Sequence, residues 1–433
     1  MKLHFRLRQI TRQMWFLPAV FSLLALATVF AAQYATFLLP QELPFDVSER
    51  ATETVLTIVA TSMLAVATFA LGTMVSALFG AAQGSSPRAV RLIAEDRSAQ
   101  APISIFIGSF LFSIVGIIAL SSGFYSAPGR LILFGATILV VILLVGALIR
   151  WINKIPSIGQ VGETIKRVEA ATSEAFAEIA HQPLFGCLPA TPAAENGSPL
   201  HAAKVGYVQH FRPDELQAVA EDFGLFIHVS ARPGTYATPV RPLALVAGEL
   251  TDAAEERIHK AFVVGSDRTF EHDPRFGLIV LSEIASRALS PGVNDPGTAI
   301  SVIHNHVRIL DRWFRTEPAV DGRPTFDRVS VDPIVPEHIL NDAFRAISRD
   351  GADNIEVCQK LFEALRTVQA VSPEEFDVPV VRFASDALER VRKTMSHQAD
   401  IETVEHAAQR LFHRQLPNAS QDERHRTATE DHG

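Results

Sequence analysis

The residues best suited to chemistry lie in one short stretch, SRALSPGVNDPGTAISVIHNH, at positions 286–306. The stretch holds an Asn-Asp-Pro step at Asn294 and two histidines, His304 and His306, between apolar runs. Amides, carboxylates and imidazoles are groups that bind polar ligands or transfer protons. The two histidines point about 200° apart on a helix, so they cannot share a metal ion as an i, i+4 pair does. We expect one of them to be exposed and the other to be half-buried near Arg308.

The rest of the chain offers no stronger chemical signature. It contains no HExxH motif, no Gly-rich phosphate loop and no GxSxG elbow. Its two cysteines, Cys187 and Cys358, lack CxxC spacing, which argues against a disulfide framework and a zinc site. The formal net charge of -8 argues against nucleic-acid binding through phosphate neutralisation. We therefore predict no catalytic residue, no metal ion and no cofactor.

Local helix geometry accounts for much of the opening stretch. The run FGLIVLSEIASRAL predicts a helix, SPGVN predicts a turn, and Asp295 is placed to cap a second helix. The same device, a capping side chain before a proline at the first helical position, recurs along the chain. It occurs at Asp273-Pro274, Asp332-Pro333 and Ser372-Pro373.

A helix N-terminus beside a glycine and an asparagine can also bind a polar ligand, although the Asp295 carboxylate would repel an anion there. The candidate ligand-binding residues are Gly292, Asn294, Asp295, His304 and Asp273. An acid-base cluster is the alternative, drawn from Glu283, Arg287, Asp295 and His304. Charged residues on helices are usually solvated or paired, which weakens that alternative.

The first part of the chain, residues 1–155, is predicted to form membrane helices. The 433 residues have a mean hydropathy of +0.19, high for a soluble protein of this size. Four uncharged apolar runs are long enough to cross a hydrocarbon core of ~30 Å. They predict spans at about 14–38, 54–80, 102–124 and 131–151, within a membrane domain over 1–155.

Basic residues predict the orientation of these spans, because Lys and Arg are retained on the cytoplasmic side. They cluster before the first span, as at Arg12, after the second, as at Arg91, and after the fourth, as at Lys154. Both termini are therefore expected in the cytoplasm. The alternative is a cleaved signal peptide ending near Ala31, but its apolar run is longer than the usual 7 to 15 residues.

The second span carries a stripe of small and weakly polar residues at helical spacing. The stripe consists of Thr61, Ala65, Thr68, Gly72, Ser76 and Gly80. This small-xxx-small pattern is typical of helix packing, and the alternative is a pore lined by hydroxyl groups. The four apolar runs, the last of which extends from Leu131 to Ile149, contain no Asp, Glu, Lys, Arg or His, which argues against a proton- or ion-coupled pump.

The remaining residues predict a mainly helical domain with some strands. A strand at KVGYVQHF and a short helix at RPDELQAVAEDFG precede two further apolar runs around Arg232-Pro233-Gly234. The predicted fold is an all-α membrane domain of four transmembrane helices followed by a mainly α cytoplasmic α+β domain. After the membrane domain we expect a connecting helix and mobile loop at 156–200, a small α+β module at 201–249, a helical region at 250–415 and a disordered tail at 416–433.

Several phrases resemble one bacterial family of predicted membrane proteins, domain of unknown function 2254. They are SSPRAVRLIAEDR, VGYVQHF, ARPGTYATPVRPL and RTFEHDPRFGLIVLSEIASRALSPGVNDPGTAI. The family pattern PGIND-P-aromatic-TA has Val293 and Gly297 here at its apolar and aromatic positions. The resemblance covers nearly the whole chain. It implies a multi-pass protein of the bacterial inner membrane, but no activity and no catalytic residues.

Three functions remain open. The favoured one is an oligomeric channel- or transport-like protein with a regulatory cytoplasmic domain, whose partners are the lipid bilayer, further copies of the chain and a small solute. The second is a membrane-tethered sensor or scaffold that binds a small ligand at the helix hairpin 276–315. The third, a cytoplasmic hydrolase, lacks a nucleophile and base at recognisable spacing.

Overall fold

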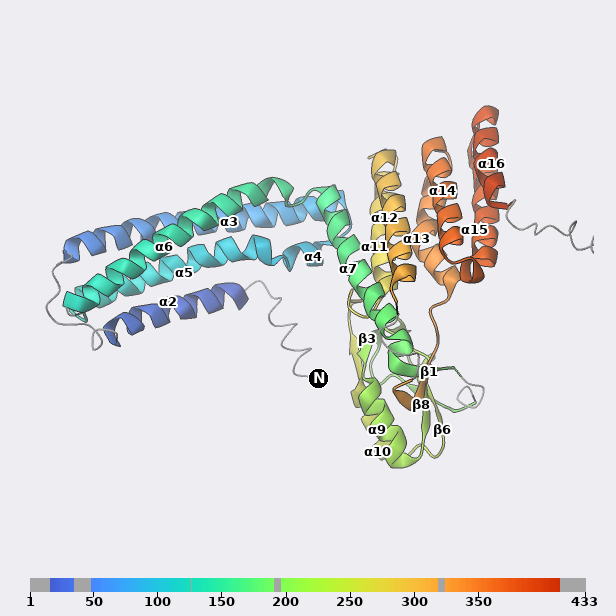
Figure 1. Cartoon of the computed structure of the whole chain (residues 1–433), viewed down its shortest axis with the longest axis horizontal. Helices are drawn as coiled ribbons and strands as arrows, with labels where there is room; N and C mark the ends of the chain where they lie inside the picture. Colours follow the sequence, from blue (N-terminus) through green and yellow to red (C-terminus); the bar gives the residue numbers. More distant parts are fainter. Residues whose placement is uncertain (1–15, 35–47, 126, 191–195, 318–323, 413–433) are drawn as a thin grey trace, which may run out of the picture. The chain divides into compact units, whose positions relative to one another are not determined.

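The computed structural model describes residues 16–34, 48–125, 127–190, 196–317 and 324–412, and it divides into two compact units (Figure 1). The first unit comprises residues 1–164 and the second residues 165–433. The predicted disordered tail at 416–433 lies outside the described residues.

The first unit is a bundle of apolar helices. Its helices are α2 (Phe16–Tyr34), α3 (Glu49–Gly84), α4 (Val90–Ala94), α5 (Arg97–Ser121) and α6 (Ala127–Lys154), followed by the short helix η2 (Ile155–Ser157). Among the described residues, three helices are long and apolar enough to cross a membrane: Glu49–Gly84, Arg97–Ser121 and Pro128–Ser157. The apolar part of α2, Phe16–Ala31, is shorter, and the ends of the predicted span 14–38 lie outside the described residues.

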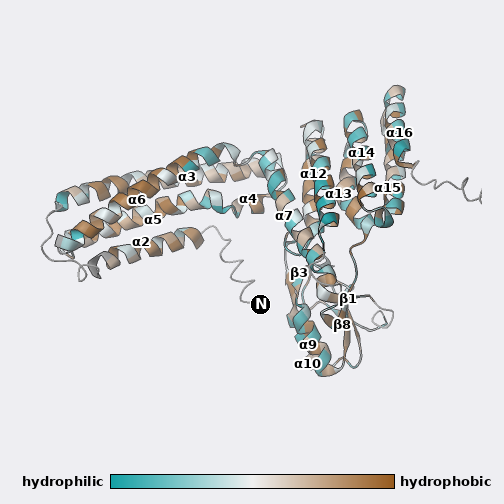
Figure 2. Cartoon of the chain, in the orientation of Figure 1, coloured by the Kyte–Doolittle hydropathy of each residue, from teal (hydrophilic) through white to brown (hydrophobic). Residues whose placement is uncertain are grey.

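Helix α5 lies at the centre of this bundle and contacts α2, α3 and α6. Small residues allow the close approach, because a Cβ at Gly108 would lie 3.1 Å from the Cβ of Phe21 on α2. Large apolar side chains such as Phe69 on α3 and Ile142 on α6 are instead exposed. Figure 2 shows hydrophobic residues along the length of these helices. Such an exposed apolar surface suits lipid rather than water.

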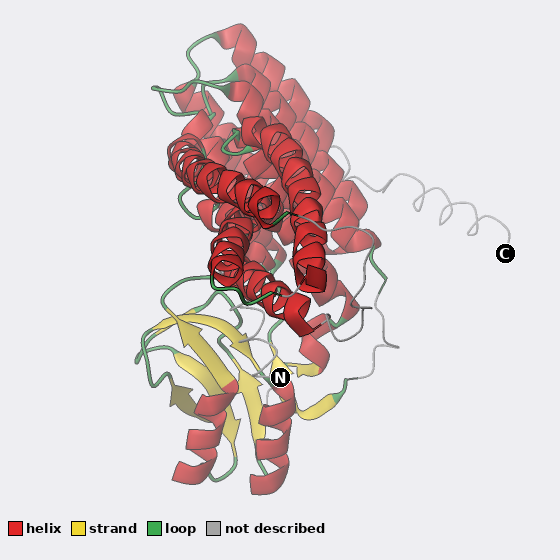
Figure 3. Ribbon diagram, turned by 90° about the vertical axis from the view of Figure 1, so that its left-hand side faces the viewer, coloured by secondary structure: helices red, strands yellow, loops and turns green. Residues whose placement is uncertain are grey.

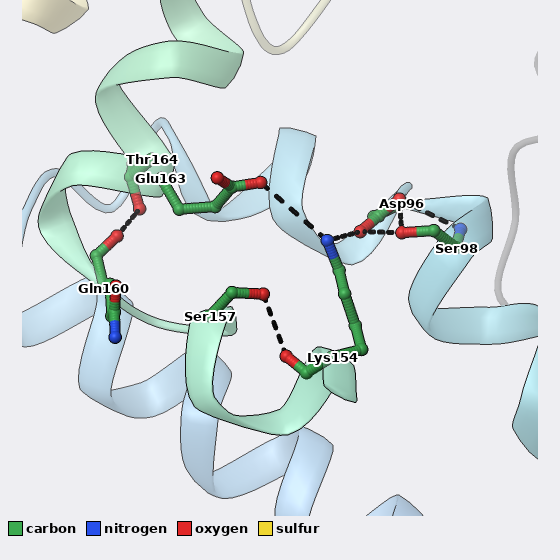
Figure 4. A network of polar contacts seen from close by, with 7 residues as sticks. All are labelled: Asp96, Ser98, Lys154, Ser157, Gln160, Glu163 and Thr164. Carbon is green, nitrogen blue, oxygen red and sulfur yellow. Dashed lines mark hydrogen bonds and ion pairs between the residues drawn. The ribbon is translucent and has the colours of Figure 1, made fainter. Parts of the chain in front are cut away.

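A polar network joins three chain segments at one end of the first unit (Figure 4). Asp96 caps α5 and accepts a hydrogen bond from the backbone N–H of Ser98 at 3.0 Å. The Lys154 Nζ at the end of α6 lies 3.5 Å from Asp96 Oδ2 and 3.8 Å from Glu163 Oε1. The positive charge of Lys154 is therefore balanced locally by two carboxylates.

Two sheets form the β part of the second unit (Figure 3). The larger has the order β1 (Cys187–Pro189), β8 (Phe326–Val331), β4 (Phe226–Val229), β6 (Pro242–Ala247) and β2 (Ser198–His201). Strand β8 runs parallel to β1 and β4, whereas the other neighbours are antiparallel. The smaller, antiparallel sheet has the order β5 (Tyr236–Ala237), β3 (Gly206–Phe211) and β7 (Phe262–Gly265).

This β part extends beyond the predicted module at 201–249. The segment expected to be a loop before residue 200 contains the short helix η3 (Pro183–Gly186) and strands β1 and β2, although 191–195 lie outside the described residues. The region expected to be helical contributes β7 and β8. Within the module, α9 (Pro213–Phe223) ends at Gly224 in the left-handed conformation, as predicted from its sequence, and packs beside α10 (Asp252–Ala261).

The helical part of the second unit is built from hairpins stacked in two layers. Its helices are α7 (Val161–His181), whose first four residues belong to the first unit, then α11 (Pro274–Ala288), α12 (Pro296–Arg315), α13 (Pro336–Asp350), α14 (Ile355–Val371), α15 (Pro373–Thr394) and α16 (Gln398–Phe412). Helix α13 contacts α11 and α15, and α14 contacts α12 and α16. Their shared core includes the fully buried rings of Phe344, Phe362 and Phe376.

Two of the four predicted caps differ from expectation. Asp273 and Asp295 cap α11 and α12 through their side chains. Asp332 instead follows strand β8, and α13 begins at Pro336 after Val335. Ser372 precedes α15 but makes no side-chain capping bond. The Asp332 carboxylate, which caps no helix, becomes part of the candidate site.

An arginine-lined cavity as the candidate functional site

The predicted ligand-binding residues lie at three separate places. Gly292, Asn294 and Asp295 lie together in the exposed turn between α11 and α12. Asp273 lies at the opposite end of α11, about 22 Å away at 1.5 Å per residue. His304 is exposed on α12, more than two turns beyond Asp295. One small ligand cannot contact all five residues.

The turn uses its polar groups to build local structure. The Asp295 carboxylate accepts hydrogen bonds from the Thr298 N–H at 3.0 Å and from the Thr298 hydroxyl at 2.6 Å. These bonds hold the pKa of Asp295 below its ordinary value. Asn294 adopts a positive φ of 49° and donates its N–H to Ser290 O at 2.9 Å. Hairpin geometry therefore accounts for these residues.

Asp273 lies in a different environment, buried to 3% exposure. Its carboxylate accepts hydrogen bonds from Arg268 Nε at 2.8 Å and Nη2 at 3.0 Å, and from the Phe276 N–H at 3.3 Å. Burial raises the pKa of Asp273, and the bonds from Arg268 oppose that rise. A Cβ at Gly234, whose φ is 88°, would lie 2.3 Å from Asp273 Oδ2. Glycine is therefore required where this loop passes over the carboxylate.

Asp273 lines a cavity of about 570 Å³, within the usual size range of small-molecule sites. Three segments that are distant in sequence form its wall: 230–241, 268–275 and 332–338. Two of them belong to the phrases ARPGTYATPVRPL and RTFEHDPRFG, which the sequence analysis singled out without relating them to each other. Four arginines lie in the lining: Arg232, Arg241, Arg268 and Arg275.

The lining holds more cations than carboxylates. Arg268 is paired with Asp273, and Arg275 Nε lies 2.5 Å from Asp342 Oδ2 outside the lining. Arg232 donates to the backbone carbonyl of Asp332. Burial lowers the pKa of Arg232 to about 10, so its guanidinium stays charged at neutral pH. The four guanidinium groups carry four positive charges, and the nearby carboxylates of Asp273, Asp332 and Asp342 carry three negative charges. One positive charge is therefore in excess.

Arg241 is the most available of these cations. Arg241 is exposed and lies in a turn, where its backbone N–H donates to Thr238 O at 3.3 Å. Within the part of the chain that the structure describes, Arg241 has no carboxylate partner. A guanidinium at the rim of a cavity is suited to bind an anion.

A serine, a histidine and an aspartate meet beside the cavity, and no local sequence pattern indicates this because 102 residues separate His228 from Ser330. The His228 Nδ1 lies 3.0 Å from Ser330 Oγ, and its Nε2 lies 3.5 Å from Asp332 Oδ1. These are the groups of a catalytic triad. His228 and Ser330 are however buried at 3% and 5% exposure, and only Asp332 lines the cavity. The arrangement positions Asp332 rather than presenting a nucleophile.

Two further histidines lie close together at the cavity. The rings of His210 and His272 are 4.4 Å apart, and His272 Nδ1 lies 3.2 Å from Glu178 Oε1. Burial, followed by the neighbouring His272, lowers the pKa of His210 to about 4, so His210 is neutral at pH 7. His272 lines the cavity and has a positive φ of 58°.

The prediction for the paired histidines of α12 is only half correct. His304 is exposed, as expected for one member, but His306 is fully buried rather than half-buried. Its Nε2 lies 3.1 Å from Ser282 Oγ on α11, and burial lowers its pKa to about 3. Arg308 instead pairs with Glu169 on α7 at 2.8 Å.

The small-residue stripe of α3 faces outward in the first unit. The five predicted packing or pore-facing residues, Thr61, Thr68, Gly72, Ser76 and Gly80, are all exposed. A Cβ at Gly72 or Gly80 would meet no atom within 4 Å among the described residues. The hydroxyls of Thr61 and Thr68 donate to carbonyls of their own helix at 2.8 and 2.9 Å. The stripe therefore does not pack against the described helices of its own unit.

Comparison with known proteins identifies the family. The model of the family described as "Predicted membrane protein (DUF2254)" matches residues 11–367. An uncharacterized protein of Mycobacterium bovis is 32% identical over 123 residues, which cover 27% of this chain and 23% of the relative. An uncharacterized protein of Mycobacterium tuberculosis gives the same values. The chain spans less than a quarter of the length of these relatives.

No solved structure matches the chain. The family match instead covers well over half of the sequence and includes every segment that lines the cavity. The protein therefore belongs to the family of predicted membrane proteins called domain of unknown function 2254.

Proposed function

We propose that this protein is a membrane-anchored sensor whose second unit binds a small anionic ligand in the arginine-lined cavity. The carrying observation is the excess of guanidinium groups in a cavity of ligand size. We place the protein in the bacterial inner membrane with both termini in the cytoplasm, on the basic residues that flank the apolar helices. A reporter that works only in the cytoplasm should then be active when it is fused to the C-terminus. A reporter that works only in the periplasm should be silent at the same position, and the reverse result would contradict this orientation.

Binding is favoured over hydrolysis because the cavity presents cations without an accessible activated nucleophile. Ser330 lies 3.0 Å from His228, but it is buried on strand β8 and does not line the cavity. The hydroxyls that do line the cavity include Ser230 and Thr235. These hydroxyls are suited to donate hydrogen bonds to an anion.

Calorimetric titration of the full-length protein in detergent tests the proposal, with phosphate, sulfate and citrate as probes at matched ionic strength. We expect at least one anion to bind, and Arg241→Gln to weaken its binding by about tenfold, the effect of one charge-assisted hydrogen bond. Arg390→Gln is the matched control, since Arg390 is an exposed arginine on α15. Unchanged binding in Arg241→Gln, or no binding of any probe, would contradict the proposal.

A second candidate function is an oligomeric channel or transport pathway in the membrane unit. It is favoured by the outward-facing stripe on α3, because small residues allow helices of neighbouring copies to approach closely. Gly72→Leu should then lower both the oligomer mass in detergent and the conductance of the protein in planar bilayers. Ile142→Leu, at an exposed position on α6, is the control. A protein that is monomeric and silent in bilayers would remove this candidate.

A further inference from the structure

The hydrogen-bonding groups of the cavity are unbalanced in favour of donors. Donor groups are present on the four arginines, on two imidazoles and on three hydroxyl residues: His272, His338, Ser230, Thr235 and Tyr236. The Asp273 carboxylate already accepts three hydrogen bonds, which leaves Asp332 as the main acceptor in the lining. A ligand with many acceptor atoms can accept hydrogen bonds from these donor groups of the lining. A phosphate monoester offers three terminal oxygens and a charge of up to about -2, more than a carboxylate does.

The lining contains an aromatic residue, Tyr236, on the same connection between strands as its available cation. Tyr236 is 48% exposed, and its ring lies 4.9 Å from that of Tyr207 in an edge-to-face pair that holds it in place. Tyr236 and Arg241 belong to the same connection between strands β4 and β6, and Tyr236 forms part of the short strand β5 within it. An exposed ring held by a second ring is suited to stack on a planar group of a ligand.

The remaining lining is apolar, and the cavity is larger than a bare phosphate requires. It includes three prolines and two aliphatic residues: Pro233, Pro274, Pro333, Ile334 and Val335. A volume of about 570 Å³ lies within the range of sites for organic ligands, which enclose both an apolar body and a few polar groups. Inorganic phosphate alone would leave most of this apolar surface uncovered.

We propose that the ligand is a phosphate ester that carries a planar ring, of the nucleoside monophosphate class. Its phosphate binds Arg241 together with the hydroxyls of Ser230 and Thr235 and the imidazole donors of the wall, and its ring stacks on Tyr236. This inference rests on the proposed anion-binding function and adds the chemistry of the ligand to it.

The experiment compares four probes on the full-length protein in detergent by calorimetric titration: inorganic phosphate, ribose phosphate, adenosine monophosphate and adenosine. We expect adenosine monophosphate to bind about tenfold more tightly than ribose phosphate, the effect of one stacked ring. Adenosine should bind more weakly than adenosine monophosphate. Tyr236→Leu should abolish the advantage of the ring without changing ribose phosphate binding, and Tyr236→Phe should keep it. Arg241→Gln should weaken both phosphate esters.

The outcomes separate this inference from the proposed function. Equal affinities for adenosine monophosphate and ribose phosphate, both weakened by Arg241→Gln, would overturn the ring-bearing ligand and leave the anion site intact. An advantage of the ring that survives Tyr236→Leu would overturn the role of Tyr236 and with it this inference. Absence of binding by all phosphate-bearing probes, together with sulfate and citrate, would overturn both proposals.

Discussion

The two ends of helix α11 carry the same sequence device in opposite environments. Asp273 at its start and Asp295 after its end each precede a proline, and each caps a helix with its carboxylate. Asp273 is buried under the loop that contains Gly234 and is paired with Arg268. Asp295 is exposed, and its carboxylate accepts hydrogen bonds from Thr298 of the helix that it caps.

The difference shows that a local motif fixes a helix boundary but not a site. Burial raises the pKa of Asp273, whereas hydrogen bonds from Thr298 lower the pKa of Asp295. The contrast arises from the segments that pack on each cap, since only the first cap is covered by residues from another part of the chain. We therefore expect substitutions at the two ends of α11 to differ in magnitude.

The largest expected effect is that of Asp273→Ala. It leaves the largely buried Arg268 guanidinium without its carboxylate, and unpairing a buried ion pair costs about 3–5 kcal/mol. The loss should appear as reduced hydrogen-exchange protection of α11 and α13 in the full-length protein. The double variant Asp273→Ala with Arg268→Met should recover part of the loss. A loss no greater than that of Asp295→Ala would contradict the distinction between the two caps.

The next effect is that of Gly234→Ala. Its Cβ would overlap Asp273 Oδ2, and its φ of 88° is unfavourable for alanine, so we expect a loss of about 3 kcal/mol. Gly224→Ala is the matched control, because Gly224 also has a positive φ of 64° but its Cβ would meet no atom within 4 Å among the described residues. It should cost about 1 kcal/mol through backbone strain alone. Equal losses of stability in Gly234→Ala and Gly224→Ala, measured by thermal unfolding, would show that the loop at Gly234 does not lie against the Asp273 carboxylate.

Between the two ends, buried His306 links α12 to α11 through Ser282. Its folded pKa of about 3 lies below the ordinary value, so the folded state binds fewer protons than the unfolded state between these values. Stability is complete above the unfolded pKa of about 6.5 and falls as the pH decreases toward 3, by about 2 kcal/mol between pH 7 and pH 5. His306→Leu should flatten this dependence in chemical unfolding, whereas His304→Gln on the exposed face should preserve it. An unchanged slope in His306→Leu would contradict the prediction.

The helices of the second unit were largely predictable from the sequence because their signals are local. Apolar periodicity predicts helices over most of 250–415, and helices α11 to α16 lie in this region. The caps at Asp273 and Asp295 followed from the same short-range chemistry.

The sheet and the cavity depended on contacts that no local pattern contains. Strand β8 pairs with β4 across about a hundred residues of chain, and β1 and β2 lie in a segment whose Pro and Gly content indicated a loop. The arginines of the cavity, such as Arg232 and Arg268, had no distinguishing spacing and were indistinguishable from surface charges. Asp273 was the one predicted ligand-binding residue that lines the cavity, and the phrases ARPGTYATPVRPL and RTFEHDPRFG marked two of its segments through family resemblance rather than through their chemistry.

The smallest expected effect is that of Asp295→Ala, which removes an exposed cap and should cost about 1 kcal/mol at neutral pH. Because the folded pKa is lowered, the contribution of the charged cap is fully present above the unfolded pKa of about 4 and is lost as the pH falls through the folded value. The stability difference between the parent protein and Asp295→Ala should therefore narrow below pH 4. Asp295→Ser keeps a capping oxygen without the titrating charge, so its stability relative to Asp295→Ala should not depend on pH. Hydrogen exchange of the first turn of α12 measures both differences, and a gap that stays constant down to pH 3 would show that the Asp295 charge contributes nothing to this end of the hairpin.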